Sequence, residues 1–242
     1  MATPLLLEPT PGMRLDYYLA HATTLSRKEA KRIIHQGRVS VAGQVERKTS
    51  TPVEADSVVC LDEQQLVLSQ GHRYLMLNKP VGVISATEDG QHRTVIDLIP
   101  PALRRDLHPV GRLDRDTTGL ILLTTDGQWS HRVSSPRSQC AKVYRAQLDQ
   151  PLTAQARSRL EQGVMLKGET VATRPADVES IDDRTIRLRL TEGRYHQVKR
   201  MLAAVGNHVI ALHRERVGSI QLDDNLPPGA YRELSKEEIS GV

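Results

Sequence analysis

Two aspartates and two arginines occupy one short stretch of the chain, directly ahead of an apolar run. The stretch is Gly-Arg-Leu-Asp-Arg-Asp-Thr-Thr-Gly at residues 111–119, and Leu-Ile-Leu-Leu follows at residues 120–123. The run is too short for a typical helix and is soon followed by Asp-Gly, which predicts a buried strand. An acid held among arginines stays ionised, because opposite charges favour the carboxylate. The pattern therefore predicts an ionised carboxylate in a polar loop on a rigid strand, where catalytic groups tend to lie.

A purely structural explanation of the same residues has to be weighed against this one. Asp-Thr-Thr-Gly also suits a turn, in which Asp116 would bond the backbone two residues further on. For a single aspartate in a loop, the turn is the commoner explanation. The choice therefore depends on other segments of the chain.

Tyr144 and Lys199 lie in two later segments that could contribute to the same site. Residues 142–148 alternate as a strand and place Tyr144 on the same face as two apolar residues. In residues 198–205, apolar side chains recur at i, i+3, i+4 and i+7, which predicts one face of a helix. Lys199 borders that face, where its long side chain can extend over a pocket. Taken alone, a core tyrosine and a solvated lysine would explain both positions.

Together these segments resemble the catalytic motifs of the pseudouridine synthases, and within them the RsuA branch. The matching motifs are Arg-Leu-Asp, two residues and Thr-Thr-Gly-Leu at 112–120, Lys-x-Tyr at 142–144, and Gly-Arg-Tyr-His-Gln-Val-Lys-Arg-Met at 193–201. The Lys-Pro pair at 79–80 and His-Arg-Glu-Arg-Val-Gly at 213–218 also match. The resemblance covers nearly everything from Met13 to the C-terminus.

The resemblance implies a role for each polar residue. Asp114 would be the catalytic carboxylate, a nucleophile or an electrostatic partner of the ribose. Lys199 would orient it, at a position where many relatives carry arginine. Tyr144 would stack on the target uracil, and Arg112 would fill the space left when the uridine flips out. Asp116 is the rival nucleophile, which we expect to brace the loop.

The implied reaction is the isomerisation of a specific uridine of small-subunit (16S) ribosomal RNA to pseudouridine. Nothing is oxidised in this reaction, so neither a redox cofactor nor a metal is expected. Two alternatives stay open. One is a synthase that acts on large-subunit RNA, and the other is a non-catalytic RNA-binding assembly factor with the same scaffold.

A basic helix is predicted near the N-terminus. Ser26 and Glu29 form a capping box, which predicts a helix that ends near Gly37. One side of this helix is apolar, and the opposite side carries Arg27, Lys28, Lys31, Arg32 and His35. Such a face suits an RNA backbone, although a simply solvated face is about equally common. The segment resembles the small RNA-binding fold named for ribosomal small-subunit protein four, which implies that this face contacts RNA.

The expected fold class is α+β, with a small N-terminal α/β module and a larger catalytic domain. The expected boundaries are a disordered leader at 1–12, the RNA-binding module at 13–62, a linker at 63–72 and the synthase domain at 73–242. The synthase domain should begin with a strand, a Lys-Pro turn and a second strand over residues 74–85. By resemblance, its central sheet should be largely antiparallel.

Composition sets broader bounds on these predictions. The chain has 242 residues, a net charge of +4 and an isoelectric point near 9.2, which is compatible with nucleic acid but does not prove it. With 3% aromatic residues and no Phe, aliphatic side chains must fill the core. The two cysteines show no metal-ligand spacing, and no stretch suggests a membrane span or signal peptide. We expect a cytoplasmic monomer, and the resemblance implies that its partner is ribosomal RNA.

Overall fold

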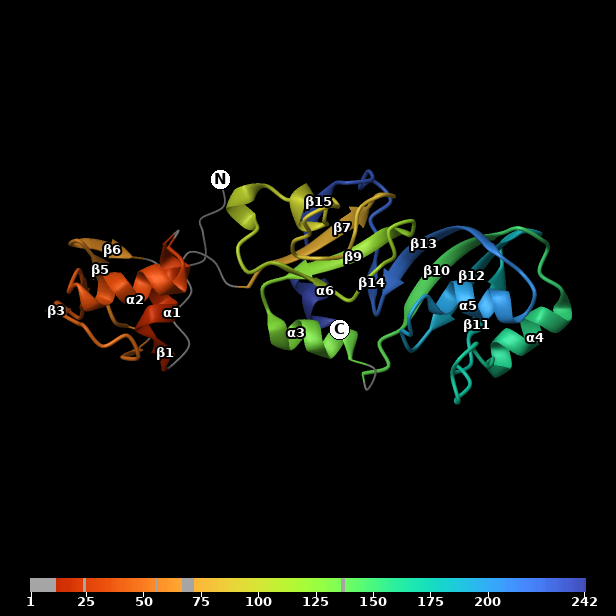
Figure 1. The fold of residues 1–242 in the computed structure, drawn as a ribbon, viewed down its shortest axis with the longest axis horizontal. Helices are drawn as coiled ribbons and strands as arrows, with labels where there is room; N and C mark the ends of the chain where they lie inside the picture. Colours follow the sequence, from red (N-terminus) through yellow and green to blue (C-terminus); the bar gives the residue numbers. More distant parts are fainter. Residues whose placement is uncertain (1–11, 24, 55, 67–71, 136–137) are drawn as a thin grey trace. The chain divides into compact units, whose positions relative to one another are not determined.

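The computed structural model describes residues 12–23, 25–54, 56–66, 72–135 and 138–242. The chain divides into two units, Met1–Gly71 and His72–Val242 (Figure 1). The predicted leader at 1–12 lies outside the described residues, apart from Gly12. Each unit has its own hydrophobic core and is described separately.

The N-terminal unit packs two helices against short strands. Helix α2 begins as predicted: the Ser26 hydroxyl accepts from the Glu29 backbone, and the Glu29 carboxylate accepts from the Ser26 backbone. The apolar side of α2, Ala30, Ile33 and Ile34, is buried in the core of this unit. Strands β3, β2, β5 and β6 form one sheet in that order, and β1 pairs with β4. The bounds are β1 Met13–Arg14, α1 Leu15–Ala22, α2 Arg27–His35, β2 Val39–Val41, β3 Gln44–Val45, β4 Pro52–Val53, β5 Val59–Leu61 and β6 Gln64–Leu66.

The start of the predicted linker at 63–72 is wrong. Strand β6 lies inside it and pairs antiparallel with β5, from Val59 opposite Leu66 to Leu61 opposite Gln64. The Tyr18 hydroxyl also donates to the Leu66 carbonyl at 3.1 Å. The polar composition of 63–66 belongs to a sheet edge, whose exposed side chains resemble those of a linker. Residues 67–71 lie outside the described part of the chain.

The C-terminal unit is built on a sheet of nine strands, which confirms the predicted α+β class. The main order is β11-β12-β10-β13-β9-β7-β15, with β14 paired to β13 and β8 paired to β9. All pairings are antiparallel except that of β13 with β9. The strand bounds are β7 Tyr74–Lys79, β8 His108–Val110, β9 Thr118–Thr124, β10 Lys142–Leu148, β11 Asp177–Ser180, β12 Thr185–Leu190, β13 Val209–Val217, β14 Ile220–Gln221 and β15 Tyr231–Glu233.

Helices cover different parts of this sheet. In Figure 1, α4 and α5 lie against β10 to β12, whereas α3 and α6 lie beside β7 and β9. The helical bounds are η1 Ile96–Leu98, η2 Pro101–Leu103, α3 Gly127–Ser134, α4 Ala154–Gln162, α5 Gln197–Ala204 and α6 Lys236–Ser240.

The second strand predicted after the Lys-Pro turn does not form. Residues 81–85 make one isolated bridge, between Ile84 and Thr94. The Gly82 backbone instead donates to the Arg115 carbonyl at 2.8 Å. This segment therefore bonds to the loop that carries the two aspartates.

Strand β9 is buried on both faces. Ile121 and Leu123 pack into a cluster with the η1 segment, while Leu120 and Leu122 pack on the opposite face with Trp129 of α3. Burial on both sides explains why the apolar run is uninterrupted rather than alternating. The strand thus provides a rigid base for the loop that precedes it.

Gly119 allows β9 to approach β13 closely. Its φ is +100°, and a Cβ built there would lie 2.3 Å from the Arg214 carbonyl oxygen. Any larger residue would push the two strands apart, because that contact is with backbone rather than a flexible side chain. The glycine of the Thr-Thr-Gly motif therefore fixes where β9 meets β13, next to the aspartate loop.

Candidate active site

A cavity of about 540 Å³ opens between the aspartate loop, β10, β13 and the start of α5. Asp114, Tyr144, Lys199 and Arg112 all line it, so the structure brings together the four residues predicted for the catalytic unit. Its volume falls in the range of small-molecule sites, roughly 300–1,000 Å³. A single nucleotide is of a suitable size for such a space.

Asp114 lies between two side-chain nitrogen atoms of the α5 segment. Its Oδ2 is 3.2 Å from Lys199 Nζ, and its Oδ1 is 3.3 Å from His196 Nε2. The side chain is 28% exposed, so the carboxylate can still be reached from the cavity. Both oxygens are therefore held in place while one side stays open to a substrate.

Lys199 also binds the second aspartate of the loop. Its Nζ lies 2.6 Å from Asp116 Oδ1, closer than it lies to Asp114. That hydrogen bond is the main reason why the pKa of Asp116 lies below its usual value. Burial lowers the pKa of Lys199, but hydrogen bonds to Asp116 and Asp114 outweigh it, so the pKa of the lysine is raised. Lys199 is thus a shared cation for two carboxylates.

The expectation that the loop's own arginines hold its acids was wrong. Arg112 and Arg115 are exposed, and neither makes an ion pair within the described part of the chain. In a loop this tight, neighbouring side chains point in different directions, so sequence proximity does not produce contact. The cation comes instead from α5, more than eighty residues later.

The last residue of β7 and the segment after it bind the aspartate loop. The Ser85 hydroxyl donates to the Leu113 carbonyl at 2.9 Å and accepts from the Leu113 backbone at 3.0 Å. Lys79 Nζ donates to the Thr117 carbonyl at 2.7 Å and to the Pro80 carbonyl at 3.0 Å. Ser85 and Lys79 therefore fix the two ends of the loop that presents Asp114.

Lys79 is a lysine with no exposed surface. Burial is the largest influence on its pKa and lowers it to about 8, against the opposing effect of Asp116 and Asp114. In the unfolded chain the pKa of this lysine is about 10.4. Between these two pH values the unfolded state binds more protons, so the group makes the free energy of unfolding rise with pH.

Lys79→Met is therefore expected to remove this rise and to lower turnover about tenfold, because the aspartate loop loses its anchor. Denaturant unfolding of both proteins at pH 7 and pH 10 measures the first effect. Because other groups titrate in this range, the informative quantity is the stability difference between wild type and variant, which should grow toward high pH. A constant difference would contradict the assignment.

His196 is held in a strained backbone conformation. Its φ is +47°, in the left-handed region, at the residue that caps α5. The flanking residues fix it: Gln197 Oε1 accepts from the Arg194 backbone at 2.8 Å, and Gln197 Nε2 donates to Glu192 at 2.7 Å. Such strain persists where neighbouring contacts enforce it, and here it directs the imidazole at Asp114.

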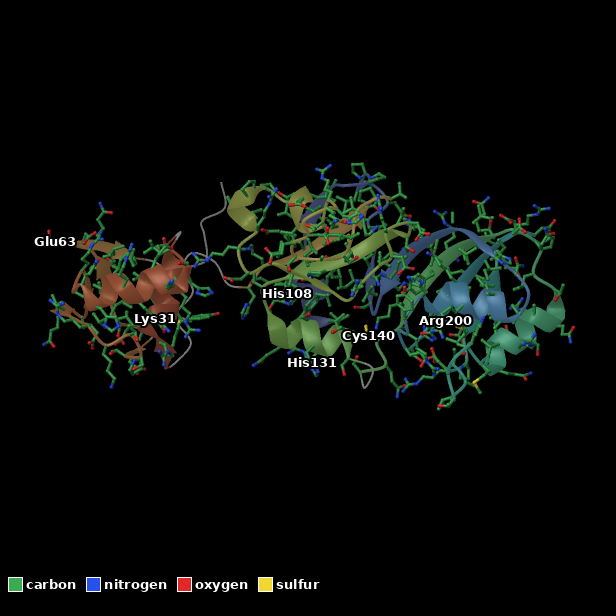
Figure 2. All side chains as sticks on the ribbon, in the orientation of Figure 1. Lys31, Glu63, His108, His131, Cys140 and Arg200 are labelled. Atoms are coloured by element: carbon green, nitrogen blue, oxygen red, sulfur yellow. The ribbon has the colours of Figure 1, made fainter. Side chains whose placement is uncertain are left out.

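A second set of contacts braces the same segment from outside. Arg194 bonds Glu169 and donates to the Ala172 carbonyl at 2.7 Å. Arg200, labelled on α5 in Figure 2, pairs with the same Glu169 at 2.6 Å. The positions of His196 and Lys199 are therefore set by a charged network as well as by the helix.

Tyr144 lies on β10 directly opposite Arg214 of β13, on the side that faces the cavity. Arg214 is 3% exposed, and its Nε donates to the Leu120 carbonyl at 2.8 Å. A tyrosine ring held against a buried strand neighbour has little freedom. It can therefore form one wall for a flat ring that enters the cavity.

The predicted RNA-binding residues lie in the N-terminal unit, on α2. Arg27 and Lys31 surround Asp16, a carboxylate with no exposed surface, at 3.3 and 3.7 Å (Lys31 is labelled in Figure 2). Lys28 and Arg32 are exposed and form no ion pair among the residues that the structure describes. Of the four Lys and Arg residues on this basic face, two are therefore tied to a buried acid and two are available.

Two residues of the site were given no role from the sequence. His196 was part of a matched motif, but no periodicity distinguishes it, and its direction depends on a left-handed backbone. Lys79 was part of the matched Lys-Pro pair, but a lysine in a turn is weak evidence by itself. A lone lysine at the end of an apolar strand is a usable signal, since such a residue must find buried acceptors.

The described residues contain neither a metal-binding cluster nor a membrane-spanning helix. No group of three or more His, Cys, Asp or Glu side chains there could hold a metal ion. Likewise, none of the helices in these ranges is long and apolar enough to cross a membrane.

Comparison with known proteins gives consistent matches. Residues 73–204 match the RNA pseudouridylate synthase family, and residues 13–59 match the S4 domain. "Ribosomal small subunit pseudouridine synthase A" of Escherichia coli (strain K12) is 46% identical over 230 residues, which cover 95% of this chain and 100% of that protein. Its namesake in Pasteurella multocida (strain Pm70) is 45% identical over 228 residues, or 94% and 98% of the two chains.

A solved structure agrees with these matches. "Crystal structure of pseudouridylate synthase" superposes with a TM-score of 0.69 at 39% identity, and covers 95% of this chain and 99% of that one. The family predicted from the motifs is thereby confirmed. With an S4 domain ahead of its catalytic unit, this chain belongs to the RNA pseudouridylate synthase family and is a pseudouridine synthase.

Proposed function

We propose that this enzyme converts one uridine of small-subunit ribosomal RNA to pseudouridine. The catalytic part of this proposal rests on the position of Asp114, which Lys199 and His196 hold at the wall of a nucleotide-sized cavity. The substrate is supported by relatives of nearly equal length whose name refers to the ribosomal small subunit. Ribosomal RNA as substrate also supports the expected cytoplasmic location. The proposed catalytic residues all come from one unit of one chain, in keeping with a monomer.

The reaction exchanges one bond for another. The bond between the ribose anomeric carbon and N1 of uracil breaks, the ring turns, and a bond from the same carbon to C5 forms. N1 gains a proton and C5 loses one, so the product is an isomer of the substrate. The demanding step is the departure of the base, during which the enzyme must stabilise the charge that develops at the anomeric carbon.

The proposed roles follow from the position of each residue. Asp114 would supply the carboxylate, either as a nucleophile or as a partner for charge on the ribose. Lys199, at 3.2 Å, would hold that carboxylate in its orientation. Tyr144 would stack on the uracil and help remove the proton from C5. Arg112, exposed at the cavity, would fill the space that the flipped uridine leaves in the RNA.

The S4 unit would hold the RNA through the basic face of α2. Lys28 and Arg32 are available for phosphates, whereas Arg27 and Lys31 also neutralise Asp16. Replacing Lys28 and Arg32 with glutamine should therefore weaken RNA binding without affecting the fold. If each contacts one phosphate, the slope of log affinity against log salt should become shallower by about 1.5.

The matched variant replaces Arg27 and Lys31 with glutamine. It should change the salt slope less and lower the stability of the N-terminal unit, because the buried Asp16 loses two partners. Filter binding at several salt concentrations and thermal unfolding measure the two effects. Equal slopes for wild type and the Lys28/Arg32 variant would show that this face is only solvated.

Two alternatives are tested by one experiment. Purified enzyme is incubated separately with small-subunit and large-subunit ribosomal RNA carrying tritium at C5 of uridine, and tritium release is measured. Release from small-subunit RNA alone is expected. Release from large-subunit RNA alone would favour the other class of synthase. Binding without release from either RNA, or from assembly intermediates, would favour an assembly factor.

A further inference from the structure

Tyr195 is an exposed aromatic residue at the rim of the catalytic cavity. Its side chain is 75% exposed, the highest value among the large hydrophobic residues described. Its ring stacks on His196 with centroids 3.7 Å apart and an interplanar angle of 22°. Both residues line the cavity that holds Asp114.

The stacked pair is fixed relative to the catalytic carboxylate. His196 lies 3.3 Å from Asp114 Oδ1, and its backbone is held in the left-handed region. Arg200 additionally donates to the Tyr195 carbonyl at 3.1 Å. One face of the tyrosine is thus covered by a ring in contact with Asp114, while most of its surface is open to solvent.

Free cationic side chains share the same rim. Arg112 and Arg115 both line the cavity, are exposed, and make no ion pair within the described ranges. An aromatic surface beside unpaired arginines is the combination with which proteins bind single-stranded nucleic acid: the bases stack and the phosphates pair with the cations.

We propose that Tyr195 is a stacking platform for an unpaired base adjacent to the target uridine. This inference rests on the proposed function and deepens it: the enzyme would select RNA in which a neighbour of the target is also unstacked. The target uracil enters the cavity beside Asp114 and Tyr144, and the neighbouring base stays at the rim on Tyr195. The Tyr195 hydroxyl makes no hydrogen bond among the described residues, so the ring is the functional part.

The first test compares Tyr195→Ala with Tyr195→Phe on small-subunit ribosomal RNA, with tritium release as the readout. Loss of one base–aromatic stack should raise KM about tenfold in Tyr195→Ala, with kcat changed by less than about twofold. Tyr195→Phe should match wild type, because it keeps the ring. Ile210→Ala is the control, since Ile210 is 61% exposed on β13 and does not line the cavity.

The second test changes the RNA. The uridine that the wild-type enzyme modifies is located first. The nucleotide on its 5′ side and the nucleotide on its 3′ side are then replaced by an abasic residue, one in each of two RNAs. At one of these positions the abasic RNA should raise KM for wild type about tenfold and abolish the difference between wild type and Tyr195→Ala. An unchanged KM in Tyr195→Ala, an equal defect in Tyr195→Phe, or a difference that persists on both abasic RNAs would overturn the proposal. Failure of wild type to modify small-subunit RNA would instead count against the proposed function.

Discussion

Replacing Asp114 with asparagine is expected to reduce turnover by at least ~10³-fold and to leave RNA affinity nearly unchanged. The amide has almost the same shape but carries no charge, so it can neither attack nor stabilise a cationic centre. Lys199 and His196 lie at 3.2 and 3.3 Å from this side chain, and they would face a neutral group. Single-turnover tritium release and filter binding measure the two quantities separately.

Asp116→Asn is the matched control within the same loop. Asp116 is 69% exposed and shares the Lys199 cation, so its loss should cost turnover only about tenfold. If Asp116→Asn were the more severe change and Asp114→Asn nearly silent, the catalytic carboxylate would be Asp116. Loss of both turnover and binding in Asp114→Asn would indicate a folding defect, which circular dichroism would detect.

Lys199→Met is expected to lower turnover at neutral pH by about 10²-fold. It removes a cation that contacts both loop carboxylates, at 3.2 Å from Asp114 and 2.6 Å from Asp116. Without it, Asp116 loses the hydrogen bond that lowers its pKa, and Asp114 loses the cation that orients it. Lys199→Arg keeps the charge, and its turnover should stay within about fivefold of wild type.

Asp116 provides an independent measure of the same change. In the wild type the pKa of Asp116 is lowered mainly by the hydrogen bond from Lys199. The ionised carboxylate therefore stabilises the fold above about pH 4, and this contribution is lost as the pH falls through the lowered pKa. In Lys199→Met the pKa of Asp116 should rise toward its usual value, which NMR titration can follow. An unchanged titration of Asp116 together with unchanged turnover at neutral pH would mean that Lys199 does not act on the loop.

Much of the architecture could be predicted from the sequence, because local signals and tertiary structure agree. The capping box of Ser26 and Glu29 and the apolar face of α2 are both present as predicted. The apolar run of β9 forms a strand because it is buried on both faces. The resemblance then supplied the family, which periodicity alone could not.

The remaining features depend on contacts between distant segments. The linker prediction failed because β6 is short and polar, so only its pairing with β5 distinguishes it from a loop. The neighbouring arginines were expected to provide the cation for the two aspartates, whereas Lys199 of α5 provides it. His196 reaches Asp114 only because the Glu192, Arg194 and Gln197 network holds its backbone in the left-handed region.

The most direct test of the central claim is a pseudouridine map of ribosomal RNA from cells that lack this gene and carry either the wild-type chain or Asp114→Asn. Carbodiimide treatment followed by primer extension locates the modified positions. One small-subunit position should carry pseudouridine with the wild-type chain and uridine with Asp114→Asn. A map that is the same in both strains, or that differs only in large-subunit RNA, would contradict the proposed function.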